Sequence, residues 1–197
     1  MPAQAQVYSE GSHVVSLGYG APSLLSVGFN LFTTRINYTE SNLGPIYLKY
    51  EYMASDVVAV GFQMAYARTD IEYDIDYLDR NNQVASGREG CTITNFAFYS
   101  DVNFYWLRRG RIAMYSGIGI GYNNVNYSEF SDDPNSNLTN SNELTGNAVP
   151  IGAQLTAIAI KADFVKGLGA YASFGVGKSL FEIGLCYGLG GKEGINN

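Results

Sequence analysis

Long apolar runs are absent from this chain of 197 residues, and no window of about twenty residues is continuously apolar. The sequence therefore predicts no membrane-spanning helix. Basic residues are also scarce, since 12 Lys and Arg stand against 18 Asp and Glu for a net charge of −6. No basic patch is available to neutralise phosphates, which argues against a nucleic-acid partner.

Cysteine and histidine are nearly missing as well. Cys91 and Cys186 are the only cysteines, and neither has a ligand-like neighbour such as a CxxC motif. We expect two unpaired thiols on opposite sides of the fold. His13 is the single histidine, so a Ser–His pair with an orienting carboxylate would have to be built around it at one rim. We predict no enzyme activity, no metal and no cofactor.

What the chain has instead is residue-by-residue alternation of hydrophobicity over runs of about ten. In the clearest run, large apolar side chains alternate with small or polar ones. The first set is Val58, Val60, Phe62, Met64 and Tyr66, and the second is Ala59, Gly61, Gln63, Ala65 and Ala67. One face suits lipid and the other suits a narrow interior, which is the pattern of a membrane-spanning β-barrel.

The same pattern recurs often enough to predict an all-β, eight-stranded antiparallel up-and-down transmembrane barrel. The strands are expected near residues 13–20, 45–53, 57–73, 91–107, 111–127, 149–164, 168–177 and 180–189. Short turns follow the second, fourth and sixth strands. Longer connections follow the first, third and fifth, at residues 21–44, 74–90 and 128–148. Outer-membrane barrels show this asymmetry, with short periplasmic turns and long extracellular loops.

The alternation fails in the sixth predicted strand. Ala153, Leu155 and Ala157 fit a lipid face, but Ile158 and Ile160 then have the wrong parity. A β-bulge near Ala157 would restore the pattern.

Charged residues on the inward parity form the first candidate site, a lumen network of Lys49, Glu51, Asp101 and Glu182. Lys161 or Asp163 could join it. Buried charges persist mainly when they are paired. One interpretation is an ion-pair network that plugs the barrel, and the other is a narrow, gated polar pathway. The same residues would serve both.

A second candidate site is the acidic continuation of the third strand, where a ribbon is expected above the membrane. Its carboxylates are Glu72, Asp74, Asp76 and Asp79. They suit either a solvated face that keeps the loop soluble or a site for a divalent cation, which prefers oxygen ligands. The segment lacks the Gly turn and terminal Glu of a calcium loop.

The N-terminus contains Ala3-Gln4-Ala5, a small-x-small sequence that resembles a signal-peptidase site. The alternative is a plain disordered tail. We expect a residual signal or linker segment at residues 1–9, the barrel at residues 10–190 and a C-terminal tail at residues 191–197.

A family resemblance is carried by four stretches: Gly44-Pro45-Ile46-Tyr47-Leu48-Lys49-Tyr50-Glu51-Tyr52, Ser55–Gly61, Tyr115–Tyr122 and Gly167–Gly177. They resemble strands of the small outer-membrane β-barrel proteins common in Bacteroidetes. These share the eight-stranded architecture of the transmembrane domain of outer membrane protein A. The resemblance covers residues 10–190 and implies architecture rather than activity. Such barrels usually end on an aromatic residue, whereas here residues 190–197 continue past the last predicted strand.

Together these features predict an integral protein of the bacterial outer membrane with a structural or interaction role. It would display loops, contact outer-membrane lipid and lipopolysaccharide, or pack in a larger outer-membrane assembly. The alternatives are a narrow porin-like channel for ions or small solutes and, less favoured, a lipid-modifying enzyme that depends on His13. A soluble ligand-carrying barrel is the rival at the level of the fold.

Overall fold

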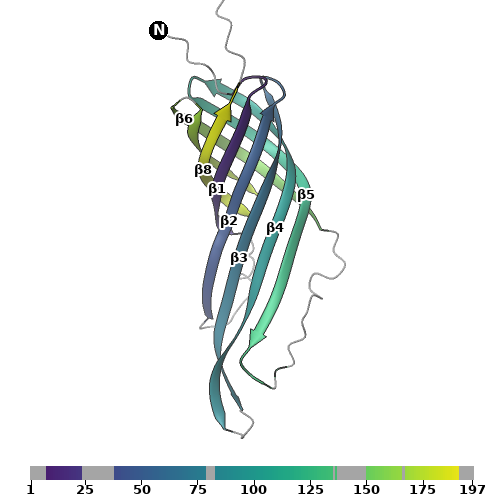
Figure 1. The fold of residues 1–197 in the computed structure, drawn as a ribbon, viewed down its shortest axis with the longest axis vertical. Helices are drawn as coiled ribbons and strands as arrows, with labels where there is room; N and C mark the ends of the chain where they lie inside the picture. The colour runs from purple at the N-terminus through teal and green to yellow at the C-terminus, as the bar shows by residue number, and fades with distance from the viewer. Residues whose placement is uncertain are drawn as a thin grey trace, which may run out of the picture.

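The computed structural model describes residues 8–23, 38–78, 83–134, 136, 150–165 and 167–190. Within them, eight strands follow one another around a closed barrel (Figure 1). The strands are β1 (His13–Ser23), β2 (Tyr38–Met53), β3 (Val58–Leu78), β4 (Val84–Arg109), β5 (Ile112–Ser131), β6 (Ile151–Val165), β7 (Leu168–Val176) and β8 (Ser179–Leu189). The predicted all-β, eight-stranded antiparallel barrel is confirmed.

Closure joins the first strand to the last. β1 pairs antiparallel with β2 on one side and with β8 on the other, where His13 lies opposite Leu189. Every neighbouring pair around the ring is antiparallel, so the barrel wall has no open edge. Closure matters because unpaired backbone groups in an apolar medium cost several kcal/mol each.

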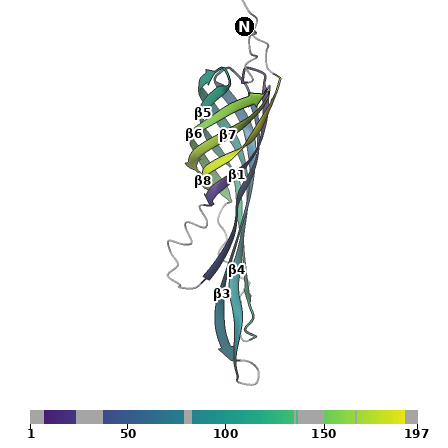
Figure 2. The ribbon, with the colours of Figure 1, turned by 90° about the vertical axis from the view of Figure 1, so that its left-hand side faces the viewer.

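Four strands extend well beyond the other four. The β1–β2 ladder ends at Tyr19 opposite Ile46, and the β5–β6 ladder ends at Tyr122 opposite Ile151. β3 and β4 continue to Leu78 opposite Val84 (Figures 1 and 2). We call this extension the ribbon; it comprises residues 38–44 of β2, 67–78 of β3, 84–95 of β4 and 123–131 of β5.

The ribbon makes several strands longer than the sequence predicts. β2 begins at Tyr38 rather than near residue 45, and β4 begins at Val84 rather than near residue 91. The outward row of apolar side chains ends where the barrel ends, but backbone pairing continues past it because the ladder needs no apolar face. Residues 24–37, 79–82 and 137–149 of the predicted long connections lie outside the described residues, as do residues 1–7 and 191–197.

The predicted alternation is borne out around the barrel. Large apolar side chains point outward and stay exposed, as in Leu17 (60%), Ile120 (63%) and Ile183 (65%). Small inward residues such as Ala59 and Ala97 are fully buried. The outer surface is therefore apolar all round, and the interior is only as wide as its own side chains require.

The predicted bulge in β6 is present. Tyr115 pairs with Ala159 and Gly117 pairs with Thr156, so Ser116 faces two residues of β6. The ladder with β7 also skips Ala157, between Thr156 and Ile158. Ala157 is the extra residue, and it lets Ile158 and Ile160 return to the outward face.

Both cysteines are free and buried, Cys91 on the ribbon and Cys186 in the lumen, as expected. Among the described residues, no helix is long and apolar enough to cross a membrane.

Candidate functional site

The lumen is filled in layers, beginning at the end with the short turns. Tyr8 is buried there and its hydroxyl donates a hydrogen bond to Asp163 Oδ1 at 2.7 Å. The rings of Tyr8, Tyr105 and Tyr115 stack in sequence, with centroids 6.2 and 4.9 Å apart. Residue 8, from the predicted linker segment, thus contributes to the core and closes this end of the barrel.

Above the tyrosines lies the first buried ion pair. Lys161 on β6 pairs with Glu51 on β2, and both side chains are almost fully buried. Asn103 Nδ2 donates to Glu51 Oε1 at 2.6 Å, and Lys161 Nζ donates to the Tyr105 hydroxyl at 2.7 Å. Each charge is therefore supported by a neutral partner as well as by its counter-ion, which a buried pair needs to offset its desolvation.

A second ion pair lies on the β1, β2 and β8 side of the lumen. Lys49 Nζ is 2.7 Å from Glu182 Oε2, and both side chains are buried. The Tyr171 hydroxyl also donates to Glu182, and the Lys49 ammonium lies 5.2 Å from the centroid of the Tyr171 ring. β2 is thereby tied across the interior to β7 and β8, which are distant from it in sequence.

Two glycines make room for this second pair. A Cβ atom built at Gly18 on β1 would collide with the Tyr171 hydroxyl, and one built at Gly184 on β8 would lie 2.6 Å from Tyr171 Cε1. The two residues are opposite one another in the ladder. Side chains here would displace Tyr171 from Glu182, so the glycines are required by close approach rather than by backbone conformation.

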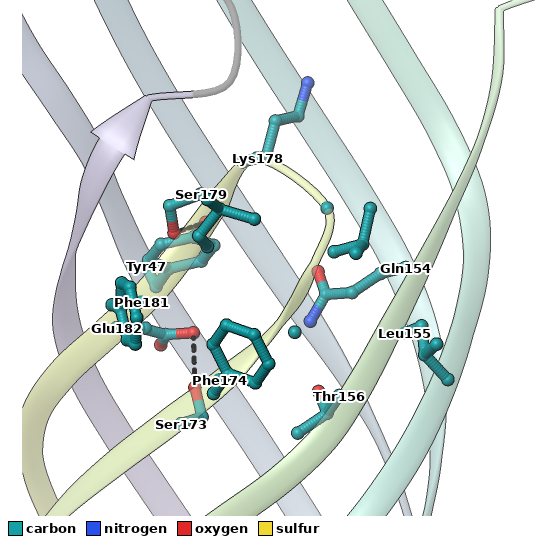
Figure 3. Close-up of a pocket in the computed structure, with 14 residues that line it drawn as sticks. Tyr47, Gln154, Leu155, Thr156, Ser173, Phe174, Lys178, Ser179, Phe181 and Glu182 are labelled. Carbon is teal, nitrogen blue, oxygen red and sulfur yellow. Dashed lines mark hydrogen bonds between the residues drawn. The ribbon is translucent and has the colours of Figure 1, made fainter. Parts of the chain in front are cut away.

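The outer end of the lumen is closed by neutral hydrogen bonds. Gln63 on β3 and Gln154 on β6 exchange two side-chain bonds across the barrel, of 2.6 and 3.2 Å. The Tyr47 and Ser179 hydroxyls are 2.8 Å apart. Figure 3 shows this region, where Tyr47, Gln154 and Glu182 border a cavity of about 20 Å³. A cavity of this size holds about one water molecule.

Lys178, in the short turn between β7 and β8, contributes a third buried ammonium. Its Nζ donates to the side-chain carbonyls of Asn95 and Asn123, and no carboxylate among the described residues forms an ion pair with it. Burial lowers the pKa of Lys178 from 10.5 to about 8, because desolvation disfavours the charged form.

The structure brings most of the predicted lumen residues together. Lys49, Glu51 and Glu182 all form ion pairs, and Lys161 joins as the partner of Glu51. Asp101 is the exception, for it faces the lumen beside Gly119 but makes no ion pair with the residues that the structure describes.

Sequence analysis missed Gln63, Gln154 and Lys178 as members of the lumen network. Gln63 has the inward parity of β3 and could have been assigned from it. Lys178 lies in a turn, where no periodicity indicates direction.

The acidic residues of the ribbon are partly paired. Glu72 accepts from Arg88 at 3.3 Å, and Asp76 accepts from the Ser86 hydroxyl at 2.8 Å. Asp74 borders an open hollow between the strands at the far end of the ribbon. Asp79 lies outside the described residues. In the described ranges no group of three or more His, Cys, Asp or Glu side chains is placed to hold a metal ion. Cation binding here stays a prediction.

Asp70, next to this acidic stretch, is held by a bidentate contact. Arg68 Nε lies 2.9 Å from Asp70 Oδ2, and the Thr92 hydroxyl donates to Asp70 Oδ1 at 2.6 Å. Hydrogen bonds from Arg68 and then Thr92 lower the pKa of Asp70. This carboxylate therefore serves to bind β3 to β4.

His13 lies at the short-turn rim of the barrel. Its Nδ1 is 2.7 Å from the Tyr50 hydroxyl, and its ring lies 5.1 Å from that of Tyr52. In the described part of the chain no serine hydroxyl or carboxylate is hydrogen bonded to it. His13, Tyr50 and Tyr52 thus form an exposed group of rings at this rim.

No protein-family model matches this chain, and a search of curated proteins finds no match.

Proposed function

We propose that this chain is an integral outer-membrane β-barrel with an interaction role, in which the barrel is an anchor and the ribbon is the part presented outside. The observation that carries the proposal is the apolar surface around the whole barrel. Leu17, Leu48, Ile120, Ile183 and Leu185 are each 45% exposed or more. A soluble barrel would gain nothing from so continuous an apolar exterior, whereas a lipid bilayer solvates it.

The filled lumen supports the anchor rather than the channel. Two buried ion pairs and the Gln63–Gln154 bridge cross the interior, and Tyr8 closes one end. A solute could pass only if these contacts broke, and separating a buried ion pair is costly. A porin-like channel is therefore the second candidate, and a lipid-modifying enzyme is the third.

The membrane assignment is tested by flotation of the refolded chain with phosphatidylcholine vesicles on a density gradient. We expect the protein to rise with the vesicles and to resist extraction at high salt and high pH. A chain that stays in solution without detergent would overturn the proposal and favour a soluble barrel.

The anchor and the channel are separated by single-channel recordings in planar bilayers. We expect no reproducible openings for the unmodified chain. Openings whose conductance changes in Asp101→Asn or Lys49→Met would establish a pore instead. Lipopolysaccharide-containing bilayers would show whether the outer-leaflet lipid alters the result.

A further inference from the structure

The ribbon, unlike the barrel, has two edges that no described strand covers. β6 pairs with β5 only as far as Tyr122, and β1 pairs with β2 only as far as Ile46. Beyond these points the outer edges of β5 and β2 are unpaired by any other described strand (Figures 1 and 2). Open strand edges are templates for pairing with another chain.

The backbone groups on the β5 edge can be assigned from two hydrogen bonds. Asn123 N donates toward β6, to Pro150 O at 2.8 Å, and Asp132 N donates toward β4, to Arg88 O at 2.9 Å. Because the direction alternates along an unbulged strand, Val125, Tyr127 and Glu129 direct their N–H and C=O groups outward. Together they offer about three pairs of donors and acceptors.

The two open edges are protected to different degrees. On β2 the edge is interrupted by a register shift between Leu43 and Ile46, and Pro45 lacks an N–H there. Bulges and proline are common protections against edge pairing. Residues 123–131 of β5 contain no proline and no lysine, and their ladder with β4 is regular. The β5 edge is the one suited to accept a strand.

The side chains along the β5 edge indicate what the added strand would contact. Val125 and Tyr127 are partly buried and pack against an apolar cluster of Ile71, Cys91 and Ile93. This cluster lies on the inward face of the ribbon, so alternate apolar residues of an added strand would continue it.

Charge indicates the nature of the partner. The ribbon strands carry many more acidic than basic residues: Glu40, Asp70, Glu72, Asp74, Asp76, Glu89 and Glu129 against Arg68 and Arg88. A second copy of the chain would bring the same negative charge and be repelled. A basic segment would be attracted.

We propose that the outer edge of β5, residues 123–131, binds an extended segment of another protein that alternates apolar with Lys or Arg residues, by adding it to the ribbon as a fifth strand. This inference rests on the proposed interaction role. It names the surface and the chemistry of the partner.

The test uses the full chain in detergent micelles and a fluorescent ten-residue peptide of alternating Lys and Val, followed by fluorescence anisotropy. We expect saturable binding. Glu129→Pro removes one outward N–H and should raise the Kd for the peptide about tenfold. The matched control Glu129→Gln keeps the N–H and should change the Kd less than about threefold. Val125→Pro removes another outward N–H and tests the same edge at a second position. Trp106 fluorescence reports whether the barrel of each variant is folded.

Two further peptides separate backbone pairing from charge attraction. A peptide with N-methyl groups along one edge keeps its charge and should not bind, and a Glu-for-Lys peptide should bind far more weakly. The proposal would be overturned if the N-methylated peptide bound equally well or if no peptide bound saturably. It would also be overturned if the chain associated with itself instead, or if the peptide bound only after residues 137–149 were deleted. If the chain floats with vesicles but fails these tests, this inference alone is wrong.

Discussion

At the scale of single residues, the interior is organised by the pairing of charges. Lys49 with Glu182 and Lys161 with Glu51 each place an ammonium and a carboxylate in the buried interior. Taking two ions out of water costs several kcal/mol each, and their attraction offsets that cost only when further hydrogen bonds are present. Tyr171 and Asn103 supply those bonds. The pairs therefore determine which strands may face one another across the lumen.

Substituting one partner of a buried ion pair should destabilise the barrel more than substituting both partners. We expect Lys49→Met alone to lower the free energy of unfolding by about 3–5 kcal/mol, because Glu182 is left as an unpaired buried charge. The double variant Lys49→Met, Glu182→Gln should recover much of that loss. Urea unfolding in detergent micelles measures both.

The matched control is the exposed pair Arg68–Asp70 on the ribbon. Arg68→Met should cost about 1 kcal/mol or less, since exposed pairs contribute little. If the double variant were as unstable as the sum of its single variants, the pairing argument would fail.

Lys178 gives the outer end of the lumen a dependence on pH. Its pKa is lowered from 10.5 to about 8 in the folded protein, so between these values the unfolded chain binds more protons. The free energy of unfolding should therefore rise with pH in this window. We expect the unmodified chain to gain about 1.5 kcal/mol relative to Lys178→Met between pH 8 and 9.5. Urea midpoints of both proteins at the two pH values measure this, and a constant difference would contradict it.

At the scale of elements, the bulge in β6 reconciles two requirements of one strand. Residues before and after Ala157 must both present apolar side chains outward, and an extra residue resets the parity between them. The Ser116 hydroxyl donates to the Ala157 carbonyl at 2.7 Å, which satisfies a group that the ladder leaves free.

Deletion of Ala157 should be tolerated. Removing it leaves Thr156 and Ile158 adjacent, and both ladders then pair without a shift while outward residues stay outward. Deletion of Ile160 is the matched control, because it would turn Lys161 toward the outer face of the barrel and break its pair with Glu51. We expect the first variant to refold with vesicles and the second to fail. Failure of both would show that the bulge itself is needed.

At the scale of the whole molecule, the chain has two parts that differ in their surroundings. The barrel is closed, with an apolar exterior and a filled interior. The ribbon extends from it with two edges that no described strand covers (Figure 2), and most of its charged residues are acidic. Closure suits a medium without water, and open edges persist only where water or a partner can satisfy them. The boundary between the two parts lies where the β1–β2 and β5–β6 ladders end.

A charged residue introduced on the barrel exterior should therefore lower the free energy of unfolding far more than one introduced on the ribbon. Leu17 lies beside Leu48 and Leu185 on the outer face. We expect Leu17→Arg to lower the free energy of unfolding in phosphatidylcholine bilayers by about 2–4 kcal/mol. Asn126→Arg on the exposed face of the ribbon should change it by less than about 0.5 kcal/mol. Equal effects of the two substitutions would contradict the division into barrel and ribbon.

Period-two alternation was enough to predict the number of strands, their faces and the position of the bulge. In a strand, the direction of each side chain follows from its parity, so Val60 or Gln63 can be assigned without a structure. The same alternation correctly predicted that Lys49, Glu51 and Glu182 point into the barrel lumen.

Only the tertiary structure decided which of these charges meet. Pairing across a lumen depends on the stagger of the strands around the ring, which alternation along one strand does not contain. Lys49 therefore pairs with Glu182 while Asp101 makes no ion pair with any described residue, although all three have inward parity. The extent of the ribbon was likewise decided by backbone pairing, which continues after the outward row of apolar side chains ends.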